Sequence, residues 1–201
     1  MHPTNNVPSA AASRTLVIVR GNSGSGKTSV ARAVRDAYGR GAALIEQDYL
    51  RRIVLREHDS SASTGIAPEF ITNAAAFALA NGYHVILEGI LHTARYSNAL
   101  LKLIKGHPGP SFVYYLDVSF AETLRRHATR PQASQFSAEQ MHEWYIDRDT
   151  LGTPGEHVIG ESSTLTQTVD HILRSSRLTE TPAVTYCPTA CAQCHAEAAA
   201  M

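Results

Sequence analysis

Short apolar runs alternate along the chain with longer segments whose apolar residues recur every three or four positions. Short runs bounded by turn residues predict buried strands, and the longer period predicts helices. The expected strands are residues 16–19, 42–45, 83–87, 112–117 and 155–160. The expected helices are residues 29–38, 49–56, 68–80, 91–104, 119–128, 137–148 and 164–173. This alternation predicts an α/β fold, a three-layer sandwich around a mainly parallel five-stranded sheet.

The loop between the first strand and the first helix matches the pattern G-x-x-x-x-G-K-[ST] without a mismatch. Glycines let consecutive amide groups of such a loop point at phosphate oxygens, and the helix N-terminus adds its positive end. Lys27 is expected to reach the terminal phosphates and Thr28 to bind Mg²⁺; Ser29 could share that role only in a shifted register. The alternative is a glycine-rich turn without a ligand. The predicted nucleotide-binding residues are Gly21, Asn22, Ser23, Gly24, Ser25, Gly26, Lys27, Thr28 and Ser29.

Polar residues follow the second and third strands, where the carboxyl ends of parallel strands form the ligand-binding edge of a sheet. Asp48 comes after the second strand, and the helix that follows it begins with a pair of arginines that includes Arg52. Glu88 ends the third strand, and His92 and Arg95 open the next helix. We expect Asp48 to have a catalytic or substrate-contacting role, Glu88 to orient Mg²⁺, and all five to contact the substrate. The alternatives are a helix cap for Asp48, a solvent-facing end for Glu88 and ordinary surface positions for the others.

An arginine-bearing segment at about residues 125–148 separates the fourth strand from the fifth. It contains a helix end, a break at Arg130-Pro131, and a second helix that starts with the capping pattern at residues 137–140. A helical lid that carries arginines can neutralise a migrating phosphoryl group and exclude water. The segment is therefore predicted to be a lid with at least one catalytic arginine; the alternative is a set of solvated helix ends.

The whole chain favours one small-molecule-binding domain. It has 201 residues, with 18 basic and 18 acidic side chains and a formal net charge of zero. The sequence has no block of Lys and Arg residues of the kind that binds nucleic acid or a membrane surface. No apolar stretch is long enough to span a bilayer. We expect a disordered leader at 1–14, a domain at 15–178 and a disordered tail at 179–201. The protein is expected to be a cytoplasmic monomer or homodimer.

The three cysteines lie together near the C-terminus. Cys187, Cys191 and Cys194 precede His195, and this set could supply four ligands to a structural zinc ion. The surrounding Pro, Thr and Ala residues favour the alternative, a reduced and disordered tail.

On these motifs the chain resembles the small P-loop kinases, a group that includes chloramphenicol phosphotransferase-like, gluconate-kinase-like and nucleoside-kinase-like enzymes. The resemblance implies ATP and Mg²⁺ as cofactors and the transfer of a phosphoryl group to a hydroxyl of a small molecule. It gives Asp48 the role of base and Arg126 and Arg130 the role of lid arginines. The chain departs from many P-loop proteins at Glu88, where they carry Asp.

Other classes of P-loop protein fit the sequence less well. A GTPase is disfavoured because the guanine signature N-K-x-D does not occur, and an ABC-type ATPase would need a signature loop that is missing. A regulatory ATPase or switch without a small-molecule acceptor stays open. Neither the acceptor nor the preference for ATP over GTP can be predicted.

Overall fold

The five expected strands form one sheet in which every neighbouring pair is parallel. The structure is a computed structural model that describes residues 14–58, 65–129 and 137–180. The strands follow the order β2-β3-β1-β4-β5 across the sheet. Their bounds are β1 Leu16–Gly21, β2 Ala42–Glu46, β3 His84–Gly89, β4 Ser111–Asp117 and β5 His157–Gly160. The predicted α/β class is confirmed, and the sheet is wholly rather than mainly parallel.

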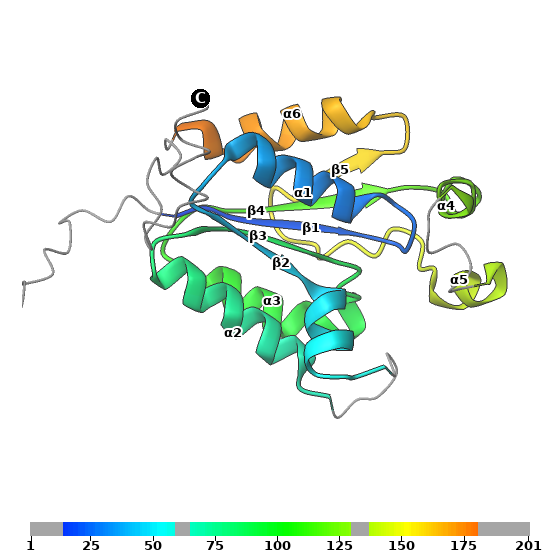
Figure 1. Cartoon of the computed structure of the whole chain (residues 1–201), viewed down its shortest axis with the longest axis horizontal. Helices are drawn as coiled ribbons and strands as arrows, with labels where there is room; N and C mark the ends of the chain where they lie inside the picture. Colours follow the sequence, from blue (N-terminus) through cyan, green and yellow to red (C-terminus); the bar gives the residue numbers. More distant parts are fainter. Residues whose placement is uncertain (1–13, 59–64, 130–136, 181–201) are drawn as a thin grey trace, which may run out of the picture.

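Helices cover both faces of the sheet and make the three layers. Figure 1 shows α1 and α6 on one face and α2 and α3 on the other, with α4 and α5 beyond the ends of the strands. The α-helices are α1 Lys27–Tyr38, α2 Ala67–Ala80, α3 Thr93–Gly106, α4 Phe120–Ala128, α5 Ala138–Trp144 and α6 Leu165–Ser175. Two further helical turns are η1 Tyr49–Val54, of the π type, and η3 Leu178–Glu180, of the 3₁₀ type.

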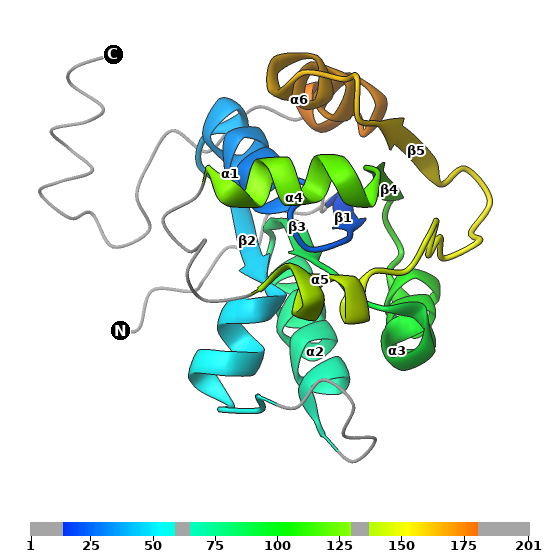
Figure 2. The same cartoon turned by 90° about the vertical axis from the view of Figure 1, so that its right-hand side faces the viewer.

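Strand β1 lies at the centre of the sheet, and all six of its residues are buried. Leu16 and Ile18 join the core under α2 and α3, whereas Val17 and Val19 join the core under α1 and α6. A strand buried on both faces is apolar at consecutive positions, which explains why residues 16–19 are all apolar. Because all strands are parallel, their carboxyl ends meet at one edge, which faces the viewer in Figure 2 behind α4 and α5.

The helix expected at 137–148 ends earlier than its sequence pattern predicts. Helix α5 stops at Trp144, and Tyr145 adopts an extended conformation with φ −75° and ψ 125°. The amide of Ile146, which would continue the helical ladder, instead donates to Asn22 Oδ1 at 3.1 Å. A contact with a residue 124 positions away therefore overrides the local pattern.

Several expectations fall outside the part of the chain that the structure describes. Most of the predicted leader and tail, the cysteine cluster and Arg130 lie there. No helix within the described ranges has both the length and the apolarity that a bilayer crossing requires. The cytoplasmic location stays a prediction.

Candidate active site

The phosphate loop connects β1 to α1 with left-handed backbone at two glycines. Gly24 has φ +84° and Gly26 has φ +98°, a region that residues with a side chain seldom adopt. A Cβ atom at Gly24 would lie 2.7 Å from the main-chain oxygen of Thr123 in α4. Glycine at position 24 thus serves both the turn of the loop and the close approach of α4. The helix begins at Lys27, two residues earlier than its apolar pattern suggests.

Lys27, Thr28 and Glu88 come together beside this loop. The Lys27 Nζ donates to the main-chain oxygen of Asn22 at 3.2 Å, and the Thr28 hydroxyl donates to both carboxylate oxygens of Glu88, each at 3.2 Å. Glu88 is 3% exposed, and burial raises the pKa of its carboxyl, although the nearby Lys27 lowers it. Ser29 is exposed.

This arrangement fits a magnesium ion bound with a nucleotide. Thr28 and Glu88 offer adjacent hard oxygen ligands, the type that Mg²⁺ prefers. The described residues hold no group of three or more His, Cys, Asp or Glu side chains able to bind a metal by themselves. Mg²⁺ commonly keeps water and phosphate oxygens as its remaining ligands, so two protein oxygens are enough.

Asp48 lies at the start of η1 with an exposed side chain. Its carboxylate pairs with Arg51 Nη2 at 3.5 Å and with Arg52 Nη1 at 3.6 Å. Within the described chain it accepts no capping bond from the turn it precedes, so the capping alternative does not account for it. The negative charge of Asp48 contributes to the raised pKa of Glu88, which places the two carboxylates in the same electrostatic neighbourhood.

Residues at the start of α3 form the opposite wall. Arg95 Nη2 donates to Glu57 Oε2 at 3.0 Å, so this predicted substrate residue already has an ion pair. His92 Nδ1 lies 3.6 Å from Asp149 Oδ2. Burial lowers the pKa of His92, and the positive charges of Arg20 and Lys27 lower it further, while Asp149 raises it. The predicted residues that the structure describes therefore come from the phosphate loop, the residue before η1 and η1 itself, the end of β3, the start of α3, and α4.

A buried ionic network beneath this edge was not predicted. The Arg20 side chain at the end of β1 is fully buried, and it donates to the main-chain oxygen of Leu91 at 2.8 Å. It pairs with Asp149 at 3.1 Å and with Glu156 at 3.5 Å. Burial lowers the pKa of Arg20, and the two carboxylates oppose that shift. An arginine that directly follows an apolar strand is the sequence signal that could have indicated such a network.

The network and the phosphate loop together hold the last residues of the predicted lid and the residue that follows them. Asp149 accepts from the amide of Thr93 at 3.0 Å and from its hydroxyl. Asn22 Nδ2 donates to the oxygen of Ile146 at 2.8 Å, and the amide of Ile146 donates back to Asn22 Oδ1. Residues 146–149, named the strap here, are therefore fixed to both the phosphate loop and α3. The side-chain amide of Asn22 serves this attachment.

The arginines of the predicted lid differ in what they contact. Arg126 Nη1 donates to the main-chain oxygen of Ser25 in the phosphate loop at 2.9 Å, and its Nη2 donates to the oxygen of Glu161 at 3.0 Å. Arg125 pairs with Glu122 at 2.6 Å and is mostly exposed, and Arg148 lies 3.4 Å from Asp117. Among the described lid arginines these contacts favour Arg126, since it already touches the phosphate loop.

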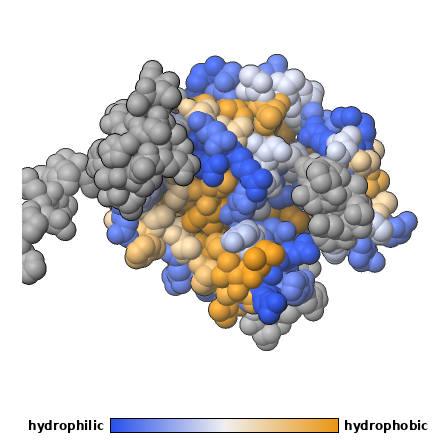
Figure 3. All heavy atoms as spheres, viewed as in Figure 1, coloured by the Kyte–Doolittle hydropathy of each residue, from blue (hydrophilic) through white to orange (hydrophobic). Residues whose placement is uncertain are grey.

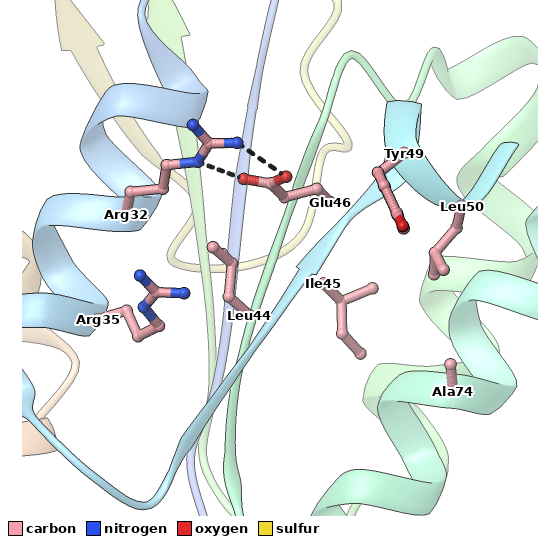
Figure 4. Close-up of a pocket in the computed structure, with 8 residues that line it drawn as sticks. All are labelled: Arg32, Arg35, Leu44, Ile45, Glu46, Tyr49, Leu50 and Ala74. Carbon is pink, nitrogen blue, oxygen red and sulfur yellow. Dashed lines mark hydrogen bonds and ion pairs between the residues drawn. The ribbon is translucent and has the colours of Figure 1, made fainter. Parts of the chain in front are cut away.

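A separate groove of about 600 Å³ lies beside edge strand β2 and contains none of the predicted site residues. Figure 4 shows Arg32 of α1 paired with Glu46 of β2 at one end of it, and Tyr49 and Leu50 of η1 at the other. Figure 3 shows apolar surface over η1 and α2. The groove is therefore distinct from the phosphate site.

Comparisons with known proteins place the chain among proteins of the same architecture. A family model described as AAA domain matches residues 16–148. The sequence matches none of the curated proteins. Among solved structures, APS kinase CysC of Mycobacterium tuberculosis, in complex with AMPPNP and APS, has a TM-score of 0.67 and 19% identity, covering 84% of this chain and 98% of that one.

Two other kinases have similar sequence identity and lower TM-scores. A gluconokinase from Sinorhizobium meliloti 1021 has a TM-score of 0.58 and 20% identity, covering 84% of this chain and 95% of that one. A sugar kinase from Janibacter sp. HTCC2649 has a TM-score of 0.60 and 18% identity, covering 86% of this chain and 99% of that one. At these identities the likeness shows a common fold.

Proposed function

Because the chain belongs to the AAA domain family and has the fold of the P-loop kinases, we propose that it transfers the γ-phosphoryl group of ATP to a hydroxyl of a small molecule. The observation that carries this proposal is the phosphate loop, whose Lys27 lies beside a Thr28–Glu88 pair at the carboxyl edge of the sheet. The kinase neighbours support it, and one of them was solved with the ATP analogue AMPPNP.

On the nucleotide side, the amides of residues 21–28 would bind the phosphates, with Ser29 at the margin. Lys27 would contact the terminal phosphates, and Thr28 and Glu88 would hold Mg²⁺. The bound ion would neutralise charge on the phosphate oxygens. The chain contributes a rigid loop, because Asn22 is tied to the strap and Ser25 to Arg126.

On the acceptor side, Asp48 would take the proton of the attacking hydroxyl. The acceptor oxygen forms a bond to the γ-phosphorus, the bond from that phosphorus to the β-phosphate oxygen breaks, and ADP leaves. Arg52, Glu88, His92 and Arg95 would contact and orient the acceptor. Positioning and neutralisation of charge would supply most of the acceleration.

The lid would complete the site. Arg126 already reaches the main chain of the phosphate loop, and Arg130 follows it four positions later in the sequence. Both would settle on the migrating phosphoryl group, where a guanidinium can offer two hydrogen bonds to its oxygens.

The proposal is tested by measuring ADP release from ATP and Mg²⁺ across a library of hydroxyl compounds. We expect release to depend on adding the right acceptor. Lys27→Ala should abolish turnover and keep the thermal unfolding midpoint of the unliganded protein. Asp48→Asn should bind ATP with unchanged affinity but lose transfer.

The outcomes separate the two classes of function. Slow release that no acceptor changes would instead support a regulatory ATPase or switch. Unchanged turnover in Lys27→Ala would exclude both, and normal transfer in Asp48→Asn would remove the base role from Asp48.

A further inference from the structure

Arg51 is a mostly buried cation whose hydrogen-bonding capacity is largely unused. Its side chain is 12% exposed, and its Nη2 makes a long contact of 3.5 Å with Asp48. Its Nε and Nη1 are buried and have no hydrogen-bond partner among the described residues. A buried guanidinium with unpaired N–H groups is costly, so the structure provides donors that a further acceptor group would satisfy.

The backbone that carries Arg51 is itself unusual. The helical turn η1 is of the π type, with the amide of Leu55 bonded to the oxygen of Leu50 at 3.0 Å. Such turns widen a helix locally and are frequent at functional sites. This one begins immediately after Asp48, so it carries Arg51 and Arg52 at the same edge of the sheet as the proposed base.

Other positive charges lie near Arg51. The positive charges of Arg51 and Arg95 both oppose the burial that raises the pKa of Tyr96, so both cations lie near its phenol. Gln47 Nε2 donates to the Tyr96 hydroxyl at 3.1 Å and fixes that wall. Arg95 of α3 lies with its Cζ 5.9 Å from the centroid of the Tyr96 ring, so a second arginine is held near the phenol on which the charge of Arg51 acts.

The ion pairs that Arg51 and Arg52 make with Asp48 are weak by geometry. Their distances, 3.5 and 3.6 Å, exceed those of a strong charge-assisted hydrogen bond, and the Asp48 side chain is 64% exposed. An anion able to form two short bonds with a guanidinium would compete well for these arginines. Once they turn to that anion, the oxygens of Asp48 are available to a hydroxyl.

We propose that the acceptor carries an anionic group, a carboxylate, sulfate or phosphate, which binds Arg51 while Asp48 receives the proton of the reacting hydroxyl. This inference rests on the kinase function proposed above and names the class of its substrate. Binding of the anion and release of Asp48 are then one event. A neutral analogue that lacks the anion leaves Asp48 paired with the two arginines.

The test compares matched acceptors. ADP release is measured with gluconate against glucose, glycerol 3-phosphate against glycerol, and AMP against adenosine, which separates carboxylate from phosphate sources. We expect the anionic member of at least one pair to be preferred tenfold or more in kcat/KM. Arg51→Met should raise KM for that acceptor by about tenfold or more, and Arg51→Lys should recover part of the loss. Arg56→Met removes an exposed arginine just beyond η1 and should change neither quantity.

A second measurement keeps the inference testable if no compound in the set is a substrate. The protein loaded with AMPPNP and Mg²⁺, whose phosphate loop is occupied, is titrated with sodium sulfate against sodium chloride at equal ionic strength. Sulfate should raise the thermal midpoint of the wild type and of Arg56→Met, and leave Arg51→Met unchanged. The rise in midpoint on adding AMPPNP itself should be the same in all three, which shows that they are folded.

The possible failures are distinguishable. A neutral acceptor used as well as its anionic partner, or a KM unaffected by Arg51→Met, overturns the anionic class and leaves the kinase function standing. A sulfate response absent from the wild type also overturns it. ADP release that depends on no acceptor, together with a sulfate response lost in Arg51→Met, overturns the kinase function and keeps the anion site.

Discussion

At the scale of single residues, the least replaceable charge outside the proposed chemistry is Arg20. It lies fully buried at the end of β1, and its compensation comes from Asp149 and Glu156. Removing one partner of a buried ion pair leaves a charge in a medium that solvates it poorly, which costs more than the pair contributes. Asp149 also accepts from the main chain and hydroxyl of Thr93, so its loss would leave several donors unpaired.

Asp149→Ala should therefore lower the free energy of unfolding by about 3–5 kcal/mol. The measurement is equilibrium urea denaturation followed by circular dichroism. Asp170→Ala, an exposed position on α6, is the matched control and should change stability by about 0.5 kcal/mol or less. A loss for Asp149→Ala as small as the control's would mean that water compensates Arg20.

Residue-scale features divide into those that the sequence reveals and those that it does not. The phosphate loop could be predicted because its chemistry needs particular residues at fixed local spacing. The partners of Arg20 could not be predicted, because Asp149 lies 129 positions away in the sequence and only the fold brings the two side chains together. Arg51 and Arg52 look alike in sequence, and the buried, unpaired nitrogens of Arg51 distinguish them only in the structure.

At the scale of elements, the first residue of β3, His84, is hydrogen-bonded to the residue that precedes β1. The amide of Thr15, which precedes β1, donates to the Nδ1 of His84 at 2.9 Å, and the Tyr38 ring lies 5.2 Å from the imidazole. His84 is fully buried, and burial lowers its pKa to about 4. The ring must be neutral to accept the bond from Thr15. Protonation would both remove this acceptor and bury a charge.

We therefore expect stability to depend on pH through His84. Its folded pKa lies below the ordinary value of 6.5, so the unfolded chain takes up the proton first. The contribution is complete above pH 6.5 and is lost as the pH falls toward 4, by about 3 kcal/mol in all. Urea denaturation at a series of pH values from 7.5 to 4 should show this loss. His84→Gln, which keeps an acceptor that does not titrate in this range, should flatten the curve, and an unchanged slope would assign the effect to other groups.

Elements were the best predicted level, and their errors have a physical cause. Strands buried on both faces and helices with one apolar stripe can be predicted from the local sequence pattern. The end of α5 cannot, because the helix is interrupted by the hydrogen bond from Ile146 to the distant residue Asn22. The π-type turn after β2 was expected only as a helical stretch, since its wider hydrogen bonding has no distinct apolar period.

At the scale of the whole molecule, the strap makes the lid and the sheet one cooperative unit. The chain has a single tryptophan, Trp144, at the end of α5 and two residues before the strap's Ile146. Asn22 and Arg20 hold the strap at two points, one on the phosphate loop and one under the edge of the sheet. The fluorescence of Trp144 should therefore report global unfolding in the wild type.

Removing one attachment should separate the two transitions. In urea, tryptophan fluorescence and far-ultraviolet circular dichroism should give the same midpoint for the wild type. In Asn22→Ala, which loses both bonds to Ile146, the fluorescence transition should come first. Glu143→Ala, an exposed change on α5 itself, is the control and should keep the two midpoints together. Coincident midpoints in Asn22→Ala would show that the Asp149 attachment alone is enough.

The distance along the chain between Arg20 and its carboxylates also bears on synthesis. A ribosome delivers Arg20 129 residues before Asp149 and 136 residues before Glu156. While the nascent polypeptide is shorter than that, Arg20 at the centre of the sheet has no counter-charge. The side-chain amide of Asn22 in the phosphate loop also lacks its hydrogen-bond partner, the main chain of Ile146. The first strand of the sheet, although translated before the other strands, is thus among the last to reach its final state.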